Sequence, residues 1–205
     1  MIDKEKFIGD GYWLLPPGKL ANVVVCLEMT AKPTQRPVPQ RDRPFALERM
    51  PGPDLGAYRA LFRRIGEDWM WFSRLKMPDD RLHAILADPA VEVFVLKEDQ
   101  IHIGLLELDF REEGQCELAF FGLVPEAIGQ GAGRFLMDQA IQKAWARPIR
   151  RLWVHTCSFD HPGALGFYRR SGFVPYAYAV EVHDDPRLTG HLPRTASPQI
   201  PLIEK

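Results

Sequence analysis

The chain has 205 residues, of which 46% are hydrophobic and 26% are charged, and its formal net charge is −1. This length suits one domain with a short appendage, and the composition is ordinary for a globular protein. A nearly neutral chain has no global field that would attract nucleic acid or an anionic membrane, and no run is long enough for a transmembrane helix. The sequence therefore argues against nucleic-acid and membrane partners.

The cysteines and the first residues indicate the compartment. Cys26, Cys116 and Cys157 are odd in number and widely spaced, which suits neither a disulfide framework nor a zinc site. The first residues contain no apolar segment of the kind that a signal peptide requires. We therefore expect a cytoplasmic protein with reduced thiols and no bound metal.

The first 44 residues have the pattern of an extension to the main domain. Residues 12–15 and 23–27 are rich in β-forming side chains, and Pro16-Pro17-Gly18 between them supplies turn chemistry. This pattern predicts an antiparallel hairpin. Residues 32–44 carry several prolines among polar and basic residues, which is typical of a stiff connector. We expect a hairpin extension over residues 1–44 and a main domain over residues 45–205.

The main domain shows strand and helix patterns in a definite order. A strand is expected at 45–49, then a helix that Asp54 caps, and a short helix near 78–87. Strands are expected at 91–98, 102–110 and 117–123, at 151–156 and 174–183, and near 200–203, with helices after residue 133 and at 162–171. Three hairpin-type strands in a row, followed by crossover helices, predict an α/β (α+β) fold. Its mixed central sheet would have helices on both faces.

A glycine-rich loop joins the 117–123 strand to the following helix. Pro125 ends the strand because it has no N–H to donate, and Gly129, Gly131 and Gly133 then occupy alternate positions. N–H groups at a helix start, approached without hindrance from Cβ atoms, form an anion site. The alternative is a surface loop whose glycines only turn and cap. The spacing fits neither a mononucleotide P-loop nor the dinucleotide fingerprint.

Two segments resemble one known family. The segment V-P-E-x-x-G-Q-G-A-G resembles the acetyl-CoA pyrophosphate loop of the GNAT (GCN5-related) N-acetyltransferases, whose pattern is Arg/Gln-x-x-Gly-x-Gly/Ala. Ile128 stands where the family has Arg or Gln, so one polar contact is missing. Residues 161–176 resemble the family's N-x-x-A-x-x-F-Y-x-x-x-G-F helix, with His161 in place of the usual Asn. The two motifs imply a GNAT-like fold from about residue 45 onward.

The resemblance implies acetyl-CoA as co-substrate and acetyl transfer to an amine. Backbone N–H groups of the glycine-rich loop would hold the pyrophosphate. The end of the preceding strand would hydrogen-bond the pantetheine arm, with the Leu123 N–H as the donor to the thioester oxygen. His161 would contact the coenzyme, or else be a capping or exposed histidine. The implied coenzyme-binding residues are Leu123, Val124, Pro125, Gly129, Gln130, Gly131, Ala132, Gly133, Arg134 and His161.

Two side chains are candidates for proton transfer. Glu117 lies six residues before Leu123, so we expect both on the same face of the sheet. Several relatives use a glutamate at this place as a base that acts through water; the alternative is a solvated carboxylate at a strand end. Tyr168 occupies the family's general-acid position and would protonate the leaving thiolate. The alternative for Tyr168 is a role in packing.

The aromatic residues Trp69, Trp71 and Phe72 fall where the family builds the wall of its acceptor site, with plain core packing as the alternative. The charge balance does not suggest a basic peptide substrate, so we expect a small-molecule amine. The sequence thus predicts an acetyl-CoA-dependent N-acetyltransferase that works by direct transfer in a ternary complex. A non-catalytic acyl-CoA-binding or regulatory module is the alternative. A homodimer in which the extension closes the partner's cleft is a further possibility.

Overall fold

The computed structural model describes residues 8–34, 45–50, 52 and 54–204. Its strands form one seven-stranded sheet in the order β2-β3-β4-β5-β6-β1-β7. Every neighbouring pair is antiparallel except β5 and β6, which are parallel. The predicted mixed sheet is therefore confirmed.

The elements follow the predicted order closely from β2 onward. The strands are β1 (Lys19–Met29), β2 (Phe45–Arg49), β3 (Val91–Glu98), β4 (Ile101–Asp109), β5 (Gln115–Leu123), β6 (Arg151–Cys157) and β7 (Val174–Asp184). The helices are α1 (Leu55–Gly66), α2 (Ser73–Lys76), α3 (Asp79–Ala87), α4 (Ala132–Ala144) and α5 (Ala164–Arg170), with short 3₁₀ turns η1 (Glu67–Trp69) and η2 (Pro125–Ala127). No helix in the described part of the chain is long and apolar enough to cross a membrane.

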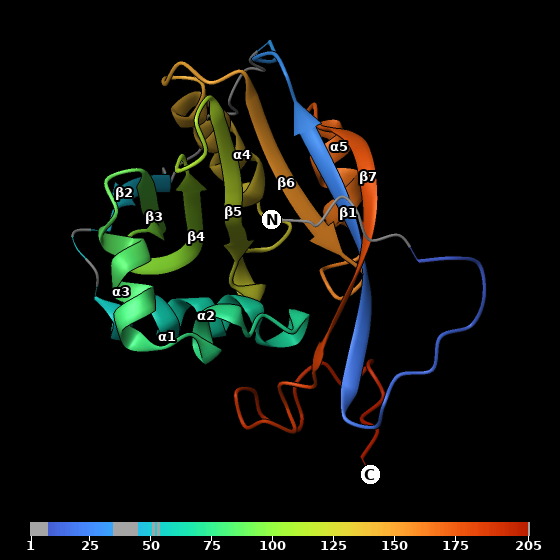
Figure 1. Cartoon of the computed structure of the whole chain (residues 1–205). Coiled ribbons are helices and arrows are strands. Elements are labelled where there is room, and N and C mark those ends of the chain that lie inside the picture. The colour runs from blue at the N-terminus through green and yellow to red at the C-terminus, as the bar shows by residue number, and fades with distance from the viewer. Residues whose placement is uncertain (1–7, 35–44, 51, 53, 205) are drawn as a thin grey trace.

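Helices cover both faces of the sheet, as predicted. In Figure 1, α1, α2 and α3 lie in front of the strands, and α4 and α5 lie behind them. We call these the front and rear faces. The Asp54 carboxylate caps α1 by accepting a hydrogen bond of 2.9 Å from the Ala57 N–H, which is the expected role of an aspartate at a helix start. Apolar side chains from α1 and α4 meet β4 and β5 from opposite sides, and this double cover places the core around β4.

The predicted N-terminal hairpin is wrong. Residues 12–15 form no strand, and the prolines after them lead into β1, which lies between β6 and β7 and is antiparallel to both. Cys26 and Leu27 of β1 are fully buried, so this apolar strand finds cover on both faces only inside the sheet, far from its neighbours in sequence. Residues 200–203 also form no strand. Most of the predicted connector lies outside the described residues, and the division of the chain at residue 44 stays a prediction.

Two substitutions in β1 test whether this strand is held inside the sheet. Leu27→Ala removes a fully buried side chain and is expected to lower the free energy of unfolding by about 2–5 kcal/mol. Val23→Ala, on the same strand but about half exposed, should cost less than about 1 kcal/mol. Urea unfolding of both variants checks the difference. Equal losses would mean that β1 is not held inside the sheet.

The outer edge of β7 and the segment before β1 expose apolar side chains. Tyr178, Val180 and Val182 are exposed on one face of β7, and Trp13 and Leu14 are exposed before β1. An uncovered apolar edge strand is a common site of association. Homodimer formation therefore stays a prediction, which sedimentation of the purified chain would check.

Candidate functional site

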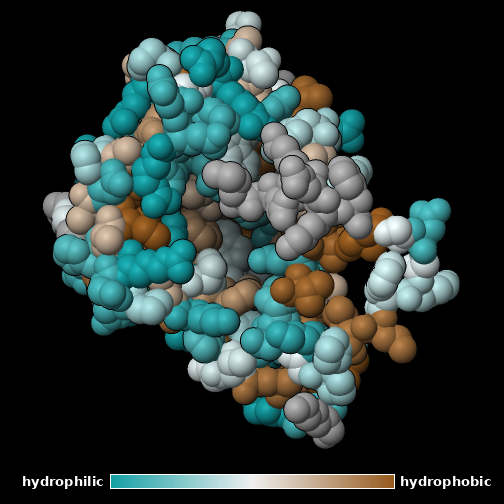
Figure 2. Space-filling model, viewed as in Figure 1, coloured by the Kyte–Doolittle hydropathy of each residue, from teal (hydrophilic) through white to brown (hydrophobic). Residues whose placement is uncertain are grey.

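Strands β5 and β6 are neighbours at one end only. Their parallel pairing joins residues 115–117 to residues 151–153 and then stops, although both strands continue. Past Glu117 the strands diverge, and a cavity of about 820 Å³ occupies the opening. Figure 2 shows the front surface hollowed between the helices on the left and the strands on the right. The sheet is therefore open at its centre, and side chains from both faces of the sheet line the cavity.

Most of the residues that the sequence analysis selected meet in this cavity. Val124, Pro125, Gln130 and Ala132 do not line it, although the loop that contains them borders it. The selected residues that line it are Trp69, Trp71, Phe72, Glu117, Leu123, Gly129, Gly131, Gly133, Arg134, His161 and Tyr168.

A β-bulge in β5 determines which residues face front and which face rear. Leu118 and Phe120 are paired with consecutive residues of β4, which leaves Ala119 as the extra residue. The bulge reverses the alternation, so the expectation that Glu117 and Leu123 share a face is wrong. Glu117 points to the front face and Leu123 to the rear. The bulge thus divides the cavity into a front half and a rear half with different side chains.

The rear half contains the start of α4. Gly129 and Gly131 have φ angles of 82° and 86°, a left-handed conformation that favours glycine. Gly131 precedes the first helical residue, and no side chain caps the helix. The N–H groups of the first turn are therefore directed at the cavity side of the loop, together with the positive end of the helix dipole. This arrangement suits a bound anion.

At the end of β5, one backbone N–H group points into the opening and the next is hydrogen-bonded within the sheet. The Val124 N–H donates to the Ile103 carbonyl of β4 at 2.9 Å. Because consecutive N–H groups of a strand point to opposite edges, the Leu123 N–H points away from β4 and toward the gap beside β6. Leu123 thus has the orientation that the resemblance implies, whereas the Val124 N–H is engaged within the sheet.

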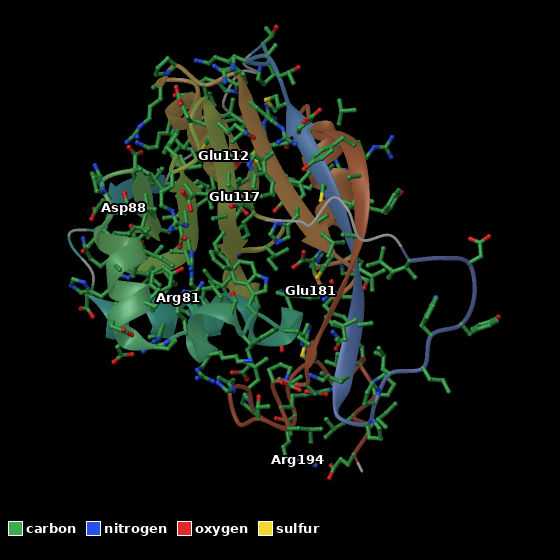
Figure 3. All side chains as sticks on the ribbon, in the orientation of Figure 1. Arg81, Asp88, Glu112, Glu117, Glu181 and Arg194 are labelled. Atoms are coloured by element: carbon green, nitrogen blue, oxygen red, sulfur yellow. The ribbon has the colours of Figure 1, made fainter. Side chains whose placement is uncertain are left out.

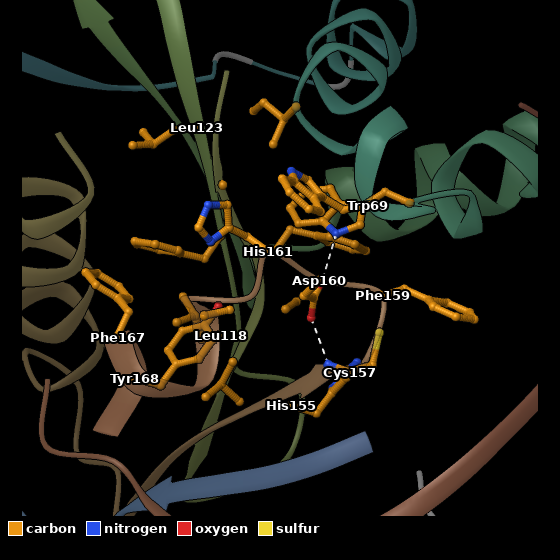
Figure 4. Close-up of a pocket in the computed structure, with 18 of the residues that line it drawn as sticks. Trp69, Leu118, Leu123, His155, Cys157, Phe159, Asp160, His161, Phe167 and Tyr168 are labelled. Carbon is orange, nitrogen blue, oxygen red and sulfur yellow. Dashed lines mark hydrogen bonds between the residues drawn. The ribbon is translucent and has the colours of Figure 1, made fainter. Parts of the chain in front are cut away.

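Tyr168 lies on α5 behind the opening, as Figure 4 shows. Only 8% of the residue is exposed, and its ring packs against Phe121 and Phe173 with centroids 6.2 and 5.9 Å apart. Burial, with a smaller effect of the Asp160 charge, raises the pKa of Tyr168 well above its ordinary value. The phenol therefore keeps its proton throughout the physiological range. Its packing role and its place in the cavity are both observed, and an acid role stays a prediction.

Glu117 lies on the front face, where β5 and β6 part. Its side chain is 26% exposed. Burial, followed by the charge of Asp109 on the neighbouring strand, raises the pKa of Glu117 to about 7. The Nδ1 atom of His155 lies 3.6 Å from the Glu117 carboxylate, and burial lowers the pKa of His155. A partly buried carboxylate whose pKa is raised to about 7 has the properties of a general base.

The predicted aromatic residues form part of the front wall. Trp71 packs between Phe62 and Phe120, with ring centroids 5.2 and 5.4 Å away, and its Nε1–H donates to Asp160 at 3.3 Å (Figure 4). Phe72 lies 4.6 Å from the ring of His183. These rings therefore pack in the core and border the cavity at once.

The loop before α5 is held by side-chain hydrogen bonds. Asp160 accepts hydrogen bonds from the Thr156 hydroxyl at 2.7 Å and from the Cys157 N–H at 2.8 Å, so it is not the N-cap of α5. His161 accepts a hydrogen bond of 2.9 Å from the Gly163 N–H, and its ring lies 5.1 Å from the ring of Trp69. Gly163 is the N-cap of α5 and no side chain caps the helix, so His161 is the exposed histidine given as its alternative, at the edge of the cavity.

A buried polar network below the front wall was missed at the sequence level. The Tyr58 hydroxyl donates to Glu107 at 2.6 Å, and Arg74 forms an ion pair with the same carboxylate. The Arg74 guanidinium also stacks on Phe120 at 5.0 Å. Arg111 is paired with Asp109 in the same way, and this pairing outweighs burial and lowers the pKa of Asp109. Acidic residues at alternate positions of an apolar strand, Glu107 and Asp109, were the available signal.

The remaining chemistry of the site is limited. Burial raises the pKa of Cys157 to about 12, so it stays a thiol and is a poor nucleophile. Within the described residues, no group of three or more histidine, cysteine or acidic side chains is placed to hold a metal ion.

Solved structures share this architecture at low sequence identity. A GCN5-related N-acetyltransferase from Sphaerobacter thermophilus is 16% identical, with a TM-score of 0.55, over 82% of this chain and 52% of that one. One from Kribbella flavida is 18% identical, with a TM-score of 0.53, over 84% of this chain and 63% of that one. The chain thus spans less than two-thirds of these two proteins.

A shorter solved structure covers part of the chain. The aminoglycoside acetyltransferase meta-AAC0020 from an uncultured soil metagenomic sample is 22% identical, with a TM-score of 0.51, over 62% of this chain and 87% of that one. At such identities these likenesses establish the fold alone. No curated protein matches the chain.

The family model described as the acetyltransferase (GNAT) family matches residues 58–173. This segment includes both motifs on which the resemblance was based, the glycine-rich loop and most of the segment that begins at His161. Since the match covers more than half of the sequence, the chain belongs to the acetyltransferase (GNAT) family.

Proposed function

We propose that this chain is an acetyl-CoA-dependent N-acetyltransferase of the cytoplasm that transfers an acetyl group directly to the amine of a small molecule. The observation that carries the proposal is the opening between β5 and β6. It joins a rear half that suits an anionic coenzyme to a front half that contains a carboxylate titrating near neutrality. Two substrates entering from opposite faces would meet there without an intermediate carrier.

The rear half fits the phosphate groups of the coenzyme. The uncapped start of α4 supplies backbone N–H groups and the positive end of a dipole. Arg134 and Arg170 border both the main cavity and a second cavity of about 350 Å³, whose other lining residues include Met137 and Ile141. Asp138, which pairs with Arg134 at 4.0 Å, also lines the second cavity. A recess with two arginines and an apolar floor beside a helix start suits the adenosine end of the coenzyme.

The proton-handling groups lie on opposite sides of the opening. The bound coenzyme supplies an activated thioester. Glu117, on the front face, accepts a proton from the acceptor amine through water. The Leu123 N–H, directed into the gap, donates to the carbonyl oxygen. Tyr168, on the rear face and fully protonated, donates its phenolic proton to the leaving sulfur.

An assay of thiol release tests the proposal against the non-catalytic alternative. The purified chain is incubated with acetyl-CoA and a panel of small amines, and free thiol and acetylated amine are both measured. We expect amine-dependent release that increases with pH between about 6 and 8, as Glu117 ionises. Tight coenzyme binding without transfer to any amine would favour the acyl-CoA-binding module instead.

A matched pair of variants tests the position of the pyrophosphate. Asp and Asn have the same shape and both tolerate the left-handed conformation of Gly131, so their comparison isolates charge. Gly131→Asp should weaken CoA binding at least about tenfold relative to Gly131→Asn, because like charges would be adjacent. Calorimetry at two salt concentrations measures this, and added salt should reduce the difference. Equal affinities in two folded variants would place the coenzyme elsewhere.

A further inference from the structure

Charge is divided between the two halves of the cavity. On the rear side the charged lining residues include Arg134 and Arg170. On the front side the two lining arginines, Arg74 and Arg111, are each neutralised by a carboxylate, Glu107 and Asp109. The front half therefore has no net positive charge from its arginines.

Three further carboxylates line the front half of the cavity: Glu117, Asp160 and Glu181. Asp160 is engaged by hydrogen bonds from Trp71, Thr156 and Cys157. Among the described residues, no lysine or arginine forms an ion pair with Glu117 or Glu181. The neighbour of Glu117 is a histidine whose pKa is lowered. The front half is consequently acidic.

Glu181 belongs to a second polar site on the front face, away from Glu117. Figure 3 shows Glu117 on β5 and Glu181 on the other side of the cleft, at β7. The Asn22 side-chain amide, on β1, donates to Glu181 at 3.0 Å, which fixes the orientation of the amide. Asn22 is 3% exposed and lines the cavity, and its Oδ1 atom has no hydrogen-bond partner among the described residues. A buried carbonyl oxygen and a carboxylate are both acceptors, so this site lacks a donor.

The surroundings of Glu181 suit a cationic group with an apolar stem. Phe72 and Phe159 line the same part of the cavity, and both rings pack against His183, with centroids 4.6 and 6.3 Å away. Aromatic faces attract ammonium groups and accept methylene chains. The side chains at this site therefore match an alkylammonium better than a neutral or anionic group.

We infer that the acceptor is a long aliphatic diamine or polyamine, whose reacting amine lies at Glu117 and whose second ammonium lies against the Glu181 carboxylate, which Asn22 orients. This inference rests on the proposed acetyl transfer. The separation follows from strand register: His155, beside Glu117, pairs with Cys26, and Asn22 lies four residues further along β1. Four residues of strand span about 13 Å. This spacing, between Cα atoms, favours a diamine with several methylene groups over a short one.

A matched set of amines tests the inference. The KM for acetylation is measured with 1,8-diaminooctane, with 1-aminooctane, and with 1,3-diaminopropane. A hydrogen-bonded charge contributes enough to lower KM by about tenfold or more, so the long diamine should have the lowest KM. The advantage should decrease as salt concentration rises. Equal KM values for 1,8-diaminooctane and 1-aminooctane would overturn the inference.

Two variants test whether the second ammonium of the diamine binds at Glu181. Glu181→Gln keeps an oxygen for Asn22 but removes the charge, so the KM ratio between 1-aminooctane and 1,8-diaminooctane should decrease toward one. Glu113→Gln removes an exposed glutamate from the turn before β5 and should leave this ratio as it is. If both variants retain the full ratio, the second ammonium does not lie at Glu181.

Calorimetry separates the inference from the proposed function. Each of the three amines is titrated into the chain saturated with CoA. Tighter binding of the long diamine supports the inference, even if no amine is acetylated and the proposed function fails. Acetylation of 1-aminooctane and 1,8-diaminooctane with equal KM would leave the proposed function intact and remove the inference.

Discussion

Glu117→Gln is expected to lower kcat by about 10²–10⁴-fold and to remove the acidic limb of the pH–rate profile. Gln has the shape of Glu but accepts no proton, so the variant removes the base without opening a cavity. In the wild type, burial and the Asp109 charge raise the pKa of Glu117 to about 7. Activity should therefore decrease as the pH falls below about 7, because the protonated carboxyl is no longer a base. A Glu117→Gln rate close to that of the wild type would contradict the assignment.

A second variant tests whether the acidic limb of the pH–rate profile comes from the ionisation of Glu117. Asp109 faces Glu117 across β4 and β5, and its charge is the second largest cause of the raised pKa. Asp109→Asn should therefore move the acidic limb of the profile to lower pH while the base itself is retained. An unmoved limb would mean that the limb reports another group.

Glu117→Gln should also stabilise the protein. A folded-state pKa raised from 4.5 to about 7 means that the charged form of Glu117 opposes folding at pH above 7. This cost decreases as the pH falls through 7 and is absent below about 4.5, the unfolded value. The shift corresponds to about 3 kcal/mol at most, and partial exposure reduces it to the order of 1–2 kcal/mol. At pH 8, Glu117→Gln should therefore unfold at higher urea concentration than the wild type.

Tyr168→Phe is expected to lower kcat by at least about tenfold while CoA affinity stays nearly the same, provided that chemistry limits the rate. The substitution keeps the ring that packs against Phe121 and Phe173 and removes only the hydroxyl. Steady-state rates and calorimetric CoA titration give the two quantities. A purely structural Tyr168 would leave kcat as it is.

The pH dependence distinguishes Tyr168 from Glu117. Because burial holds the pKa of the phenol far above its ordinary value, its ionisation should not produce a basic limb in the accessible range. Tyr168→Phe should therefore lower the rate by the same factor between about pH 7 and 9 and keep the acidic limb of Glu117. A near wild-type rate with an unaltered profile would favour protonation of the thiolate by bulk water.

Most local elements from β2 onward could be predicted from the sequence alone. Strong alternation and apolar runs predicted β2 to β6 within a residue or two, since each of these segments is a simple pattern of period 2 or a buried run. Asp54 marked the start of α1, and Gly129 and Gly131 marked a turn that needs left-handed conformations. These features depend on steric and hydrogen-bonding rules that act within a few residues.

Only the tertiary structure determined where β1 belongs. Residues 12–27 contain two β-rich runs around Pro16-Pro17-Gly18, which is a hairpin by local rules. The strand instead pairs with β6 and β7, more than a hundred residues away. Cys26 and Leu27 point to opposite faces of the sheet and are both buried, and this burial outweighs the local turn chemistry. A local sequence pattern cannot show that the partner strands are β6 and β7.

The chemistry of the site likewise depends on contacts between strands. Six residues separate Glu117 from Leu123, and uniform alternation would place them on one face. The extra residue Ala119 places them on opposite faces, and it exists only as a relation between β4 and β5. The raised pKa of Glu117 has the same origin, since it depends on burial and on Asp109 across the sheet. The sequence alone predicted which residues would carry the chemistry, whereas packing between distant strands determined which way these residues face and how their pKa values are shifted.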